Sequence, residues 1–209
     1  MKHYIKTLIY GFCAGIAISV GGWIYIKMLP INSILAAGLF SIALSLICLN
    51  GYYLYTGKIC YLFDPSELSL KTRIFTLLIG LISNYLSVLI MANILKLSFT
   101  QDTVNTIIQA KLNLTWYDCL IRGFGCGLLV YFAVESFNNS VGNITGFFIL
   151  VMAVTVFILS GFEHSIADMF YLSLDNTISW TSVLNIILII IGNSIGGLLI
   201  PCLKKITKD

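Results

Sequence analysis

The sequence predicts an all-α integral membrane protein, and three observations carry this prediction. The 209 residues are 58% hydrophobic and only 10% charged, with a mean hydropathy of +0.96, which is outside the range of soluble domains. Six apolar stretches each approach the roughly 20 residues that cross a hydrocarbon core. They are 8–26, 31–49, 74–95, 119–134, 144–162 and 183–203. The two halves of the chain also repeat. We therefore expect residues 1–209 to form a single transmembrane domain of six transmembrane helices.

The first stretch is expected to remain in the membrane as a helix, because it is long, lacks a small-residue cleavage site and precedes five more. The distribution of Lys and Arg then sets the orientation. With the N-terminus inside, the cytoplasmic side collects Lys2, Lys6, Lys71, Arg73, Lys204, Lys205 and Lys208. The outer side keeps Lys27, Lys96, Lys111 and Arg122. This predicts a multi-pass protein of the cell (inner, cytoplasmic) membrane with both termini cytoplasmic.

The second and fifth spans are too long to be straight helices. Residues 31–63 form about 33 nearly continuous apolar residues and 144–174 about 31, which overshoots the hydrocarbon core. We expect each helix to break where Gly and polar residues interrupt it, within 50–57 and 160–164. Unwound backbone at membrane depth is stable only where protein or a water-filled cavity satisfies its hydrogen bonds. The two breaks should therefore face each other across a central pathway.

Three matches between the halves fall at nearly one offset. GFCAG (11–15) recurs as GFGCG (123–127), LNGYYLYTGKICYL (49–62) lies over LSGFEHSIADMFYL (159–172), and SNYLS (83–87) lies over GNSIG (192–196). They predict two copies of a three-span unit, about 1–98 and 110–209. Because three is odd, the copies cross the membrane in opposite senses, which makes an inverted repeat of the kind found in many transport proteins. The Gly-x-x-x-Gly spacings at 11/15, 123/127 and 192/196 favour close helix packing.

Glu163 and His164 stand side by side inside the fifth span, where an ionisable group is by default a functional candidate. Either His164 points into the pathway while Glu163 hydrogen-bonds the unwound backbone, or the two only hold the break in shape. Thr56, in the opposite break, could meet His164 at the midplane or bond its own helix carbonyl. Lys111, ahead of the fourth span, either raises the local concentration of anions or simply lies in water.

Several other functions lack the residues they need. The chain contains no H-E-x-x-H or P-loop motif, and GFGCG does not follow a strand. Asp168 can reach His164 at i+4, but no nucleophile accompanies them, so no enzyme is predicted. The six cysteines have no C-x-x-C spacing and are expected to be buried apolar residues without a disulfide or metal role. The net charge of +3 comes mainly from the span flanks, so we expect no nucleic-acid partner. We also expect no cofactor.

The segment GFEHSIADMF (161–170) resembles the GFEHSxANM motif of the formate/nitrite transporter family. LYTG (54–57) resembles its LFTG-like segment, AKLNLTWYDCLIRGFGCGLLVYFAVE (110–135) its AKx…GxxCNxLVCLAVW stretch, and IIGNSIGG (190–197) its GNxxGG. The resemblance covers nearly the whole chain. It implies an aquaporin-like protomer with broken second and fifth helices, in a homopentamer with one pore in each protomer. It also implies passage of small monovalent anions, with formate first, then hydrosulfide or nitrite, and lactate in some members.

The resemblance also assigns individual residues. By motif position Thr56 matches the pore threonine, Lys111 the vestibule lysine and His164 the central histidine. The outer hydrophobic constriction corresponds to Phe40 and Phe157, and the inner one to Leu44, Leu54 and Val130. Three positions depart from the family pattern: Gly127 and Asp168 each replace an Asn, and Gly146 replaces a Lys. A second carboxylate at Asp168 would repel anions unless it is protonated or paired.

The energetic cost of passage suggests a mechanism. Moving a carboxylate-sized ion into a medium of low dielectric costs on the order of 20 kcal/mol in an idealised Born estimate. We expect Lys111 to attract the anion, and Thr56 and His164 to receive it between the constrictions. There the anion either gains hydrogen bonds, or takes up a proton and crosses as the neutral weak acid. His164 is suited to transfer this proton, because the unperturbed pKa of histidine is about 6.5. The alternatives are a channel for neutral small solutes, although the NPA boxes of aquaporins are absent, and a non-conducting membrane subunit.

Overall fold

The computed structural model describes residues 2–99, 101–140, 144–175 and 179–207. Their order is α1 (Lys2–Met28), α2 (Ser33–Asn50), α3 (Tyr55–Lys58), η1 (Ile59–Tyr61), α4 (Leu70–Leu95), η2 (Lys96–Ser98), α5 (Gln101–Leu112), α6 (Trp116–Asn139), α7 (Ile144–Leu159), α8 (Ser165–Ser173) and α9 (Trp180–Ile206). These residues include no strand, so the predicted all-helical class is confirmed. Residue 1, at the start of the first predicted repeat, and residues 208–209, at the end of the second, lie outside the described ranges, and so does Lys208 of the orientation prediction.

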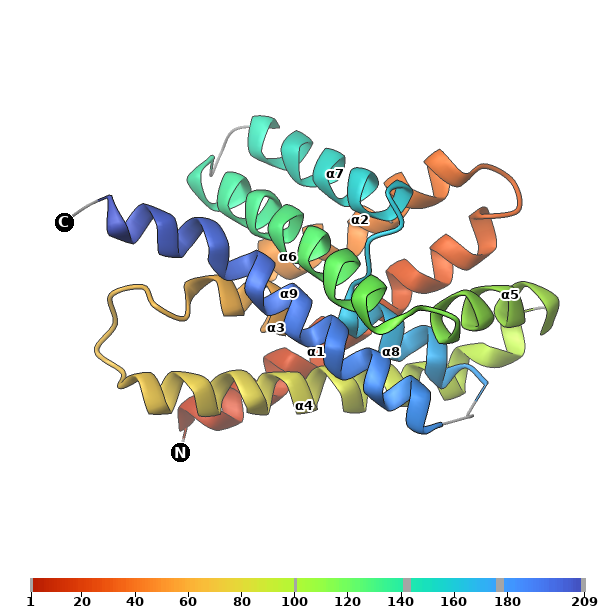
Figure 1. Ribbon diagram of the computed structural model, residues 1–209, viewed down its shortest axis with the longest axis horizontal. Helices are drawn as coiled ribbons and strands as arrows, with labels where there is room; N and C mark the ends of the chain where they lie inside the picture. Colours follow the sequence, from red (N-terminus) through yellow and green to blue (C-terminus); the bar gives the residue numbers. More distant parts are fainter. Residues whose placement is uncertain (1, 100, 141–143, 176–178, 208–209) are drawn as a thin grey trace.

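The long helices lie side by side along one axis of the molecule (Figure 1). Among the described residues, five helices are long and apolar enough to cross a membrane: α1, α2, α4 extended by η2, α6 and α9. The apolar helix α7 has only 16 residues. Large hydrophobic side chains cover the outside of the bundle, as a lipid-facing surface requires. The chain is therefore a multi-pass membrane protein, and Figure 1 places both termini at the same end.

Small residues let two helix pairs approach closely, α1 with α4 and α6 with α9. A Cβ on Gly123 of α6 would lie 2.9 Å from the Ile189 carbonyl oxygen of α9. A Cβ on Gly11 of α1 would lie 2.8 Å from Cβ of Ser83 in α4. Any side chain at either position would push the helices apart. The close packing predicted from the Gly-x-x-x-Gly spacing is confirmed at these contacts.

Both long apolar stretches are interrupted inside the bundle. Helix α2 ends at Asn50, Gly51 follows with a φ of 65°, and α3 begins only at Tyr55. Helix α7 ends at Leu159, Gly161 has a φ of 68°, and α8 begins at Ser165. Positive φ is the conformation that glycine adopts without a steric penalty, so these glycines stop their helices. The breaks fall within the predicted segments 50–57 and 160–164.

Helix α5 is an element that the apolar pattern of the sequence does not reveal. Its apolar residues Val104, Ile107 and Ile108 are buried, and it packs on α8 and α9. Asn185 of α9 donates an amide hydrogen to the Lys111 carbonyl over 3.1 Å, which fixes the C-terminal end of α5. This helix lies at the end of the molecule opposite to the termini (Figure 1). Its residue Lys111 contacts Asp168 of α8.

Candidate functional site

Two buried asparagines hold the two breaks with the same set of hydrogen bonds. The Asn84 side-chain oxygen accepts the Tyr55 N–H at 2.9 Å, and its nitrogen donates to the carbonyls of Tyr53 at 2.9 Å and Gly11 at 2.8 Å. Both chain segments are thereby tied to α4, and unwound backbone that water cannot reach is satisfied.

At the second break, Asn193 of α9 makes the corresponding hydrogen bonds. Its oxygen accepts the Ser165 N–H at 2.9 Å, and its nitrogen donates to the carbonyls of Glu163 and Gly123, each at 2.8 Å. Both asparagines are fully buried. The sequence analysis did not assign them a role, although they occupy matching positions in the aligned segments SNYLS and GNSIG.

Thr56 and His164 meet where the two breaks face each other. The Thr56 Oγ1 lies 2.8 Å from His164 Nε2, and both side chains are buried. His164 is also the N-cap of α8, because its Nδ1 accepts the Ala167 N–H at 3.2 Å. A nitrogen that accepts carries no hydrogen, so the neutral ring bears its proton on Nε2 and donates to Thr56. The Thr56 hydroxyl hydrogen is then free to donate to a third group.

A row of aromatic rings connects this pair with the α5 end of the molecule. The Phe157 ring stacks on His164, with centroids 6.2 Å apart, and meets Phe40 edge-on at 6.4 Å. Tyr25 lies edge-on to Phe40 at 6.4 Å and 6.2 Å from Tyr171. The structure thus places Phe157 directly against His164 and Phe40 against Phe157, so the two residues assigned to the outer constriction follow His164 in one row.

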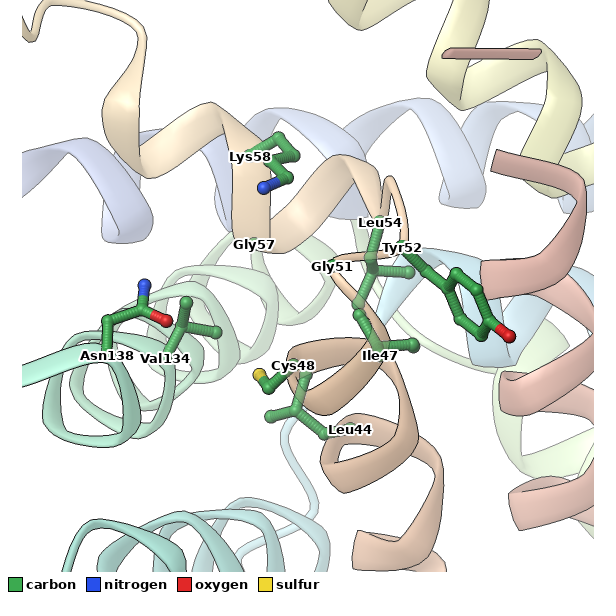
Figure 2. Close-up of a pocket in the computed structure, with 10 residues that line it drawn as sticks. All are labelled: Leu44, Ile47, Cys48, Gly51, Tyr52, Leu54, Gly57, Lys58, Val134 and Asn138. Carbon is green, nitrogen blue, oxygen red and sulfur yellow. The ribbon is translucent and has the colours of Figure 1, made fainter. Parts of the chain in front are cut away.

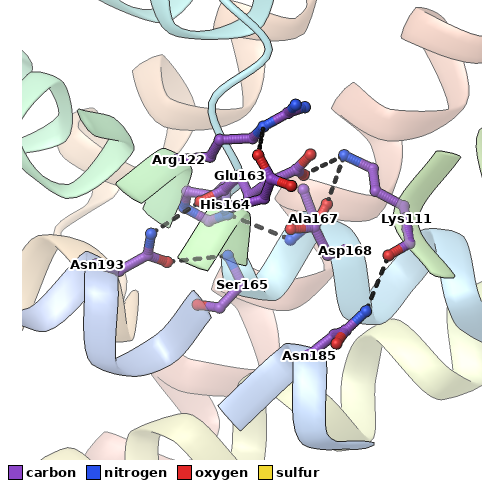
Figure 3. Close-up of polar contacts among 10 residues, drawn as sticks. Lys111, Arg122, Glu163, His164, Ser165, Ala167, Asp168, Asn185 and Asn193 are labelled. Atoms are coloured by element: carbon purple, nitrogen blue, oxygen red, sulfur yellow. Dashed lines mark hydrogen bonds and ion pairs between the residues drawn. The ribbon is translucent and has the colours of Figure 1, made fainter. Parts of the chain in front are cut away.

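Lys111 closes this row and forms a cluster with two acidic side chains (Figure 3). Its Nζ lies 5.8 Å from the centroid of the Tyr171 ring, 3.0 Å from Asp168 Oδ1, and in hydrogen-bond contact with Glu163 Oε2. Burial lowers the pKa of Lys111, but the charges of Asp168 and Glu163 outweigh it, so the net pKa shift is upward. The lysine stays charged at neutral pH. With both carboxylates ionised, the cluster carries one excess negative charge.

This cluster differs from the sequence-based expectation in two ways. The Glu163 carboxylate binds Lys111 and not the unwound backbone, which Asn193 satisfies instead. Lys111 is a compensated charge rather than a free vestibule cation, because the close approach of α5 to α8 puts both carboxylates within its reach. The predicted repulsion by Asp168 is reduced by this pairing. The second Asp168 oxygen, Oδ2, has no hydrogen-bond partner among the described residues.

On the other side of the bundle, a cavity of about 80 Å³ lies against Leu44 and Leu54, two residues assigned to the inner constriction (Figure 2). We call it the inner cavity. Its wall also includes Lys58, from α3, and Val134 and Asn138, from the last turns of α6. Val130, the third residue assigned to this constriction, is buried in α6 one turn before Val134.

Two of the departures from the family pattern have a packing cause. A Cβ on Gly127 would lie 2.8 Å from the Asn193 Cα, because α6 and α9 touch there. A Cβ on Gly146 would lie 2.6 Å from the Ser136 carbonyl oxygen, so α7 has no room for a lysine at this point. The six cysteines are free thiols, and no cluster of His, Cys, Asp and Glu in the described part of the chain could hold a metal ion.

Comparison with known proteins agrees with this arrangement. A family model described as Formate/nitrite transporter matches residues 1–205. The chain is 29% identical to an uncharacterized transporter, YrhG, of Bacillus subtilis, over 92% of this chain and 80% of that protein. It is 27% identical to a formate-nitrite transporter of Plasmodium malariae, over 94% of this chain and 71% of that protein. In fold it is similar to a pentameric formate channel with formate bound, with a TM-score of 0.86 and 22% identity, over 98% of this chain and 96% of that chain.

Proposed function

Because the chain belongs to the formate/nitrite transporter family, we propose that it is a transmembrane channel for small monovalent anions, with formate first and hydrosulfide or nitrite close behind. The observation that carries this proposal is the buried pair of Thr56 and His164, in which the His164 N–H donates to Thr56 and leaves the Thr56 hydroxyl free to donate to an anion between apolar walls. Phe40 and Phe157 form the wall on one side, and Leu44 and Leu54 line the inner cavity on the other.

The proposal includes the architecture of the channel. The chain crosses the membrane six times as an inverted three-helix repeat, with both termini in the cytoplasm, and five copies assemble with one pathway in each. The matching bonds of Asn84 and Asn193 support the repeat. The excess of Lys and Arg at the end that holds both termini supports the orientation. The similarity in fold to a channel described as pentameric supports the assembly.

The magnitudes favour passage of the anion together with a proton. A hydrogen bond to a charged group contributes about 1.5–3 kcal/mol, so the free hydroxyl of Thr56 offsets only a small part of a Born cost on the order of 20 kcal/mol. A neutral weak acid avoids most of that cost. The anion therefore takes up a proton at the narrow part of the pathway and crosses it as the acid.

We assign His164 the role of a neutral hydrogen-bond donor rather than a standing source of protons. Protonating Nδ1 would break its bond with the Ala167 N–H. It would also place a positive charge at the N-terminus of α8, the positive end of the helix dipole. The proton therefore comes from hydronium in the solution at the entrance, which gives its proton to the anion and becomes water. Lys111 holds Glu163 and Asp168 in place at the outer approach.

Formate uptake into proteoliposomes at several pH values tests the proposal. Uptake should rise as pH falls, because the protonated fraction of the substrate rises. Thr56→Val, which removes the hydroxyl but keeps the shape, and His164→Asn, which retains an N-cap acceptor, should each lower uptake at least tenfold. Thr155→Val is the matched control, because Thr155 is half-buried in α7 and bonds its own helix.

Hydrosulfide, nitrite and lactate assayed at two pH values rank the substrates in the same vesicles. Wild-type uptake in both Thr56 and His164 variants would remove this pair from the pathway. Vesicles that pass neutral solutes but no anion would overturn the proposed substrate class.

A further inference from the structure

Lys58 lies in the pathway region but has no part in the function proposed above. It stands four residues after Leu54, the N-cap of α3, as Asp168 stands four residues after His164, the N-cap of α8. The two short helices after the breaks thus carry opposite charges at corresponding places. Asp168 is paired with Lys111, whereas no ion pair between described residues involves Lys58.

The Lys58 side chain lines the inner cavity. Figure 2 shows its nitrogen directed into the space beside Val134 and Asn138, which belong to the last turns of α6. Helix α6 ends on the side of the molecule that holds both termini (Figure 1). Lys58 and Lys111 therefore occupy opposite ends of the pathway.

The surroundings of the Lys58 ammonium leave its charge available. The side chain is half-buried, and Nζ lies 6.0 Å from the centroid of the Tyr53 ring, at the outer limit of a cation–π contact. An ammonium group has three hydrogens to donate. A cavity of about 80 Å³ holds a few water molecules or an anion of a few atoms beside it. The Asn138 amide, also in the wall, can add a polar contact.

We infer that Lys58 makes the inner cavity a second binding site for small monovalent anions, at the pathway end that holds both termini. This inference rests on the proposed function for its ligand class but concerns a different residue and a different end. An uncompensated cation raises the local concentration of anions next to the inner constriction. The inner end, and not the Lys111 end, is then where anions gather before they enter.

Cys48 reports on this site without any transport. It lines the inner cavity and is partly exposed. In a purified variant that keeps Cys48 and has alanine at the other cysteines, thiol modification can be timed with an anionic and a neutral methanethiosulfonate. Lys58→Met should lower the anionic-to-neutral rate ratio at least threefold. Lys58→Arg should keep the ratio, and Lys71→Met, which removes an exposed lysine, is the control.

Formate itself provides the second measurement. It should slow modification of Cys48 when Lys58 is present, and this protection should disappear in Lys58→Met. In vesicles, Lys58→Met should also raise the formate concentration for half-maximal uptake at least threefold. The inference is wrong if Lys58→Met leaves the anionic-to-neutral rate ratio unchanged. It is also wrong if formate does not slow modification of Cys48 in the protein that keeps Lys58. Lys58-dependent protection without any formate uptake would instead sink the proposed function and leave the binding site standing.

Discussion

The two chain breaks have the same backbone support and opposite side-chain chemistry. Each is held by one buried asparagine that accepts one N–H and donates to two carbonyls. Around the first break the charged residue is Lys58, whereas around the second break Glu163 and Asp168 are acidic and both bind Lys111. The unwound backbone is therefore supported in the same way at both breaks, while the neighbouring side chains give the two breaks opposite charges.

The N-caps show the same division. Leu54 begins α3 without a side-chain cap, whereas His164 caps α8 through Nδ1 and still presents Nε2 to Thr56. In the proposed channel, the apolar cap Leu54 narrows the pathway, and the polar cap His164 supplies a hydrogen-bond donor to Thr56. The first break therefore contributes the apolar side chain of Leu54 and the hydroxyl of Thr56, and the second contributes the His164 ring that bonds this hydroxyl.

The largest effect is expected from removing either asparagine. Asn84→Ala or Asn193→Ala leaves one buried N–H and two carbonyls without their partner, at a cost of about 1–3 kcal/mol for each group. Both variants should unfold at far lower temperature in detergent, and by similar amounts if the two supports are equivalent. Asn93→Ala, an exposed position in α4, should unfold like wild type. A stable Asn84→Ala protein would end the claim of equivalence.

Next in size is the difference between the two lysines. Lys111→Met leaves Glu163 and Asp168 buried without their cation and should cost about 3 kcal/mol. Lys58→Met removes no ion pair and should change the free energy of unfolding by less than about 1 kcal/mol. Adding Glu163→Gln and Asp168→Asn to Lys111→Met should restore most of the loss. Thermal unfolding followed by circular dichroism compares wild type, the two single lysine variants and the triple variant. Equal losses of stability in Lys111→Met and Lys58→Met would contradict the difference between the two lysines.

The glycines at the breaks should have smaller and matching effects. Gly51→Ala and Gly161→Ala each place a Cβ at positive φ, which costs about 1–2 kcal/mol. Nothing lies within 4 Å of a Cβ at Gly51, so the cost there is conformational and not steric. Asparagine, which tolerates this conformation, should recover part of the stability at both positions. A loss at Gly51 as large as that of Asn84→Ala would mean that the break depends on more than its φ angle.

The sequence predicts the broken helices and the meeting of Thr56 with His164, but not the ion pairs or the asparagines that support the breaks. Apolar stretches too long for a single crossing, each containing glycine, predicted the interruptions near Gly51 and Gly161. The pairing of Thr56 with His164 followed from placing the two breaks face to face. The partner of Glu163 could not be found this way, because it depends on how the amphipathic helix α5 folds back over α8. The sequence shows Asn84 and Asn193 only as identical residues at matching positions of the two repeats. Their role could not be predicted, because it depends on which backbone groups their side chains bond in the folded protein.

The smallest effect concerns Asp168 and tests the charge of the outer entrance. Asp168→Asn removes the excess negative charge of the cluster while keeping an acceptor for Lys111. The oxygen Oδ2 has no partner in the described part of the chain, so the substitution breaks no bond there. Formate uptake well below saturation should rise about threefold, because an entering anion is repelled less. The gain should shrink as ionic strength rises. Asp102→Asn removes an exposed charge on α5 and should change uptake less. Unchanged uptake in Asp168→Asn would mean that this carboxyl is already neutral, and the two entrances would then differ only in Lys58.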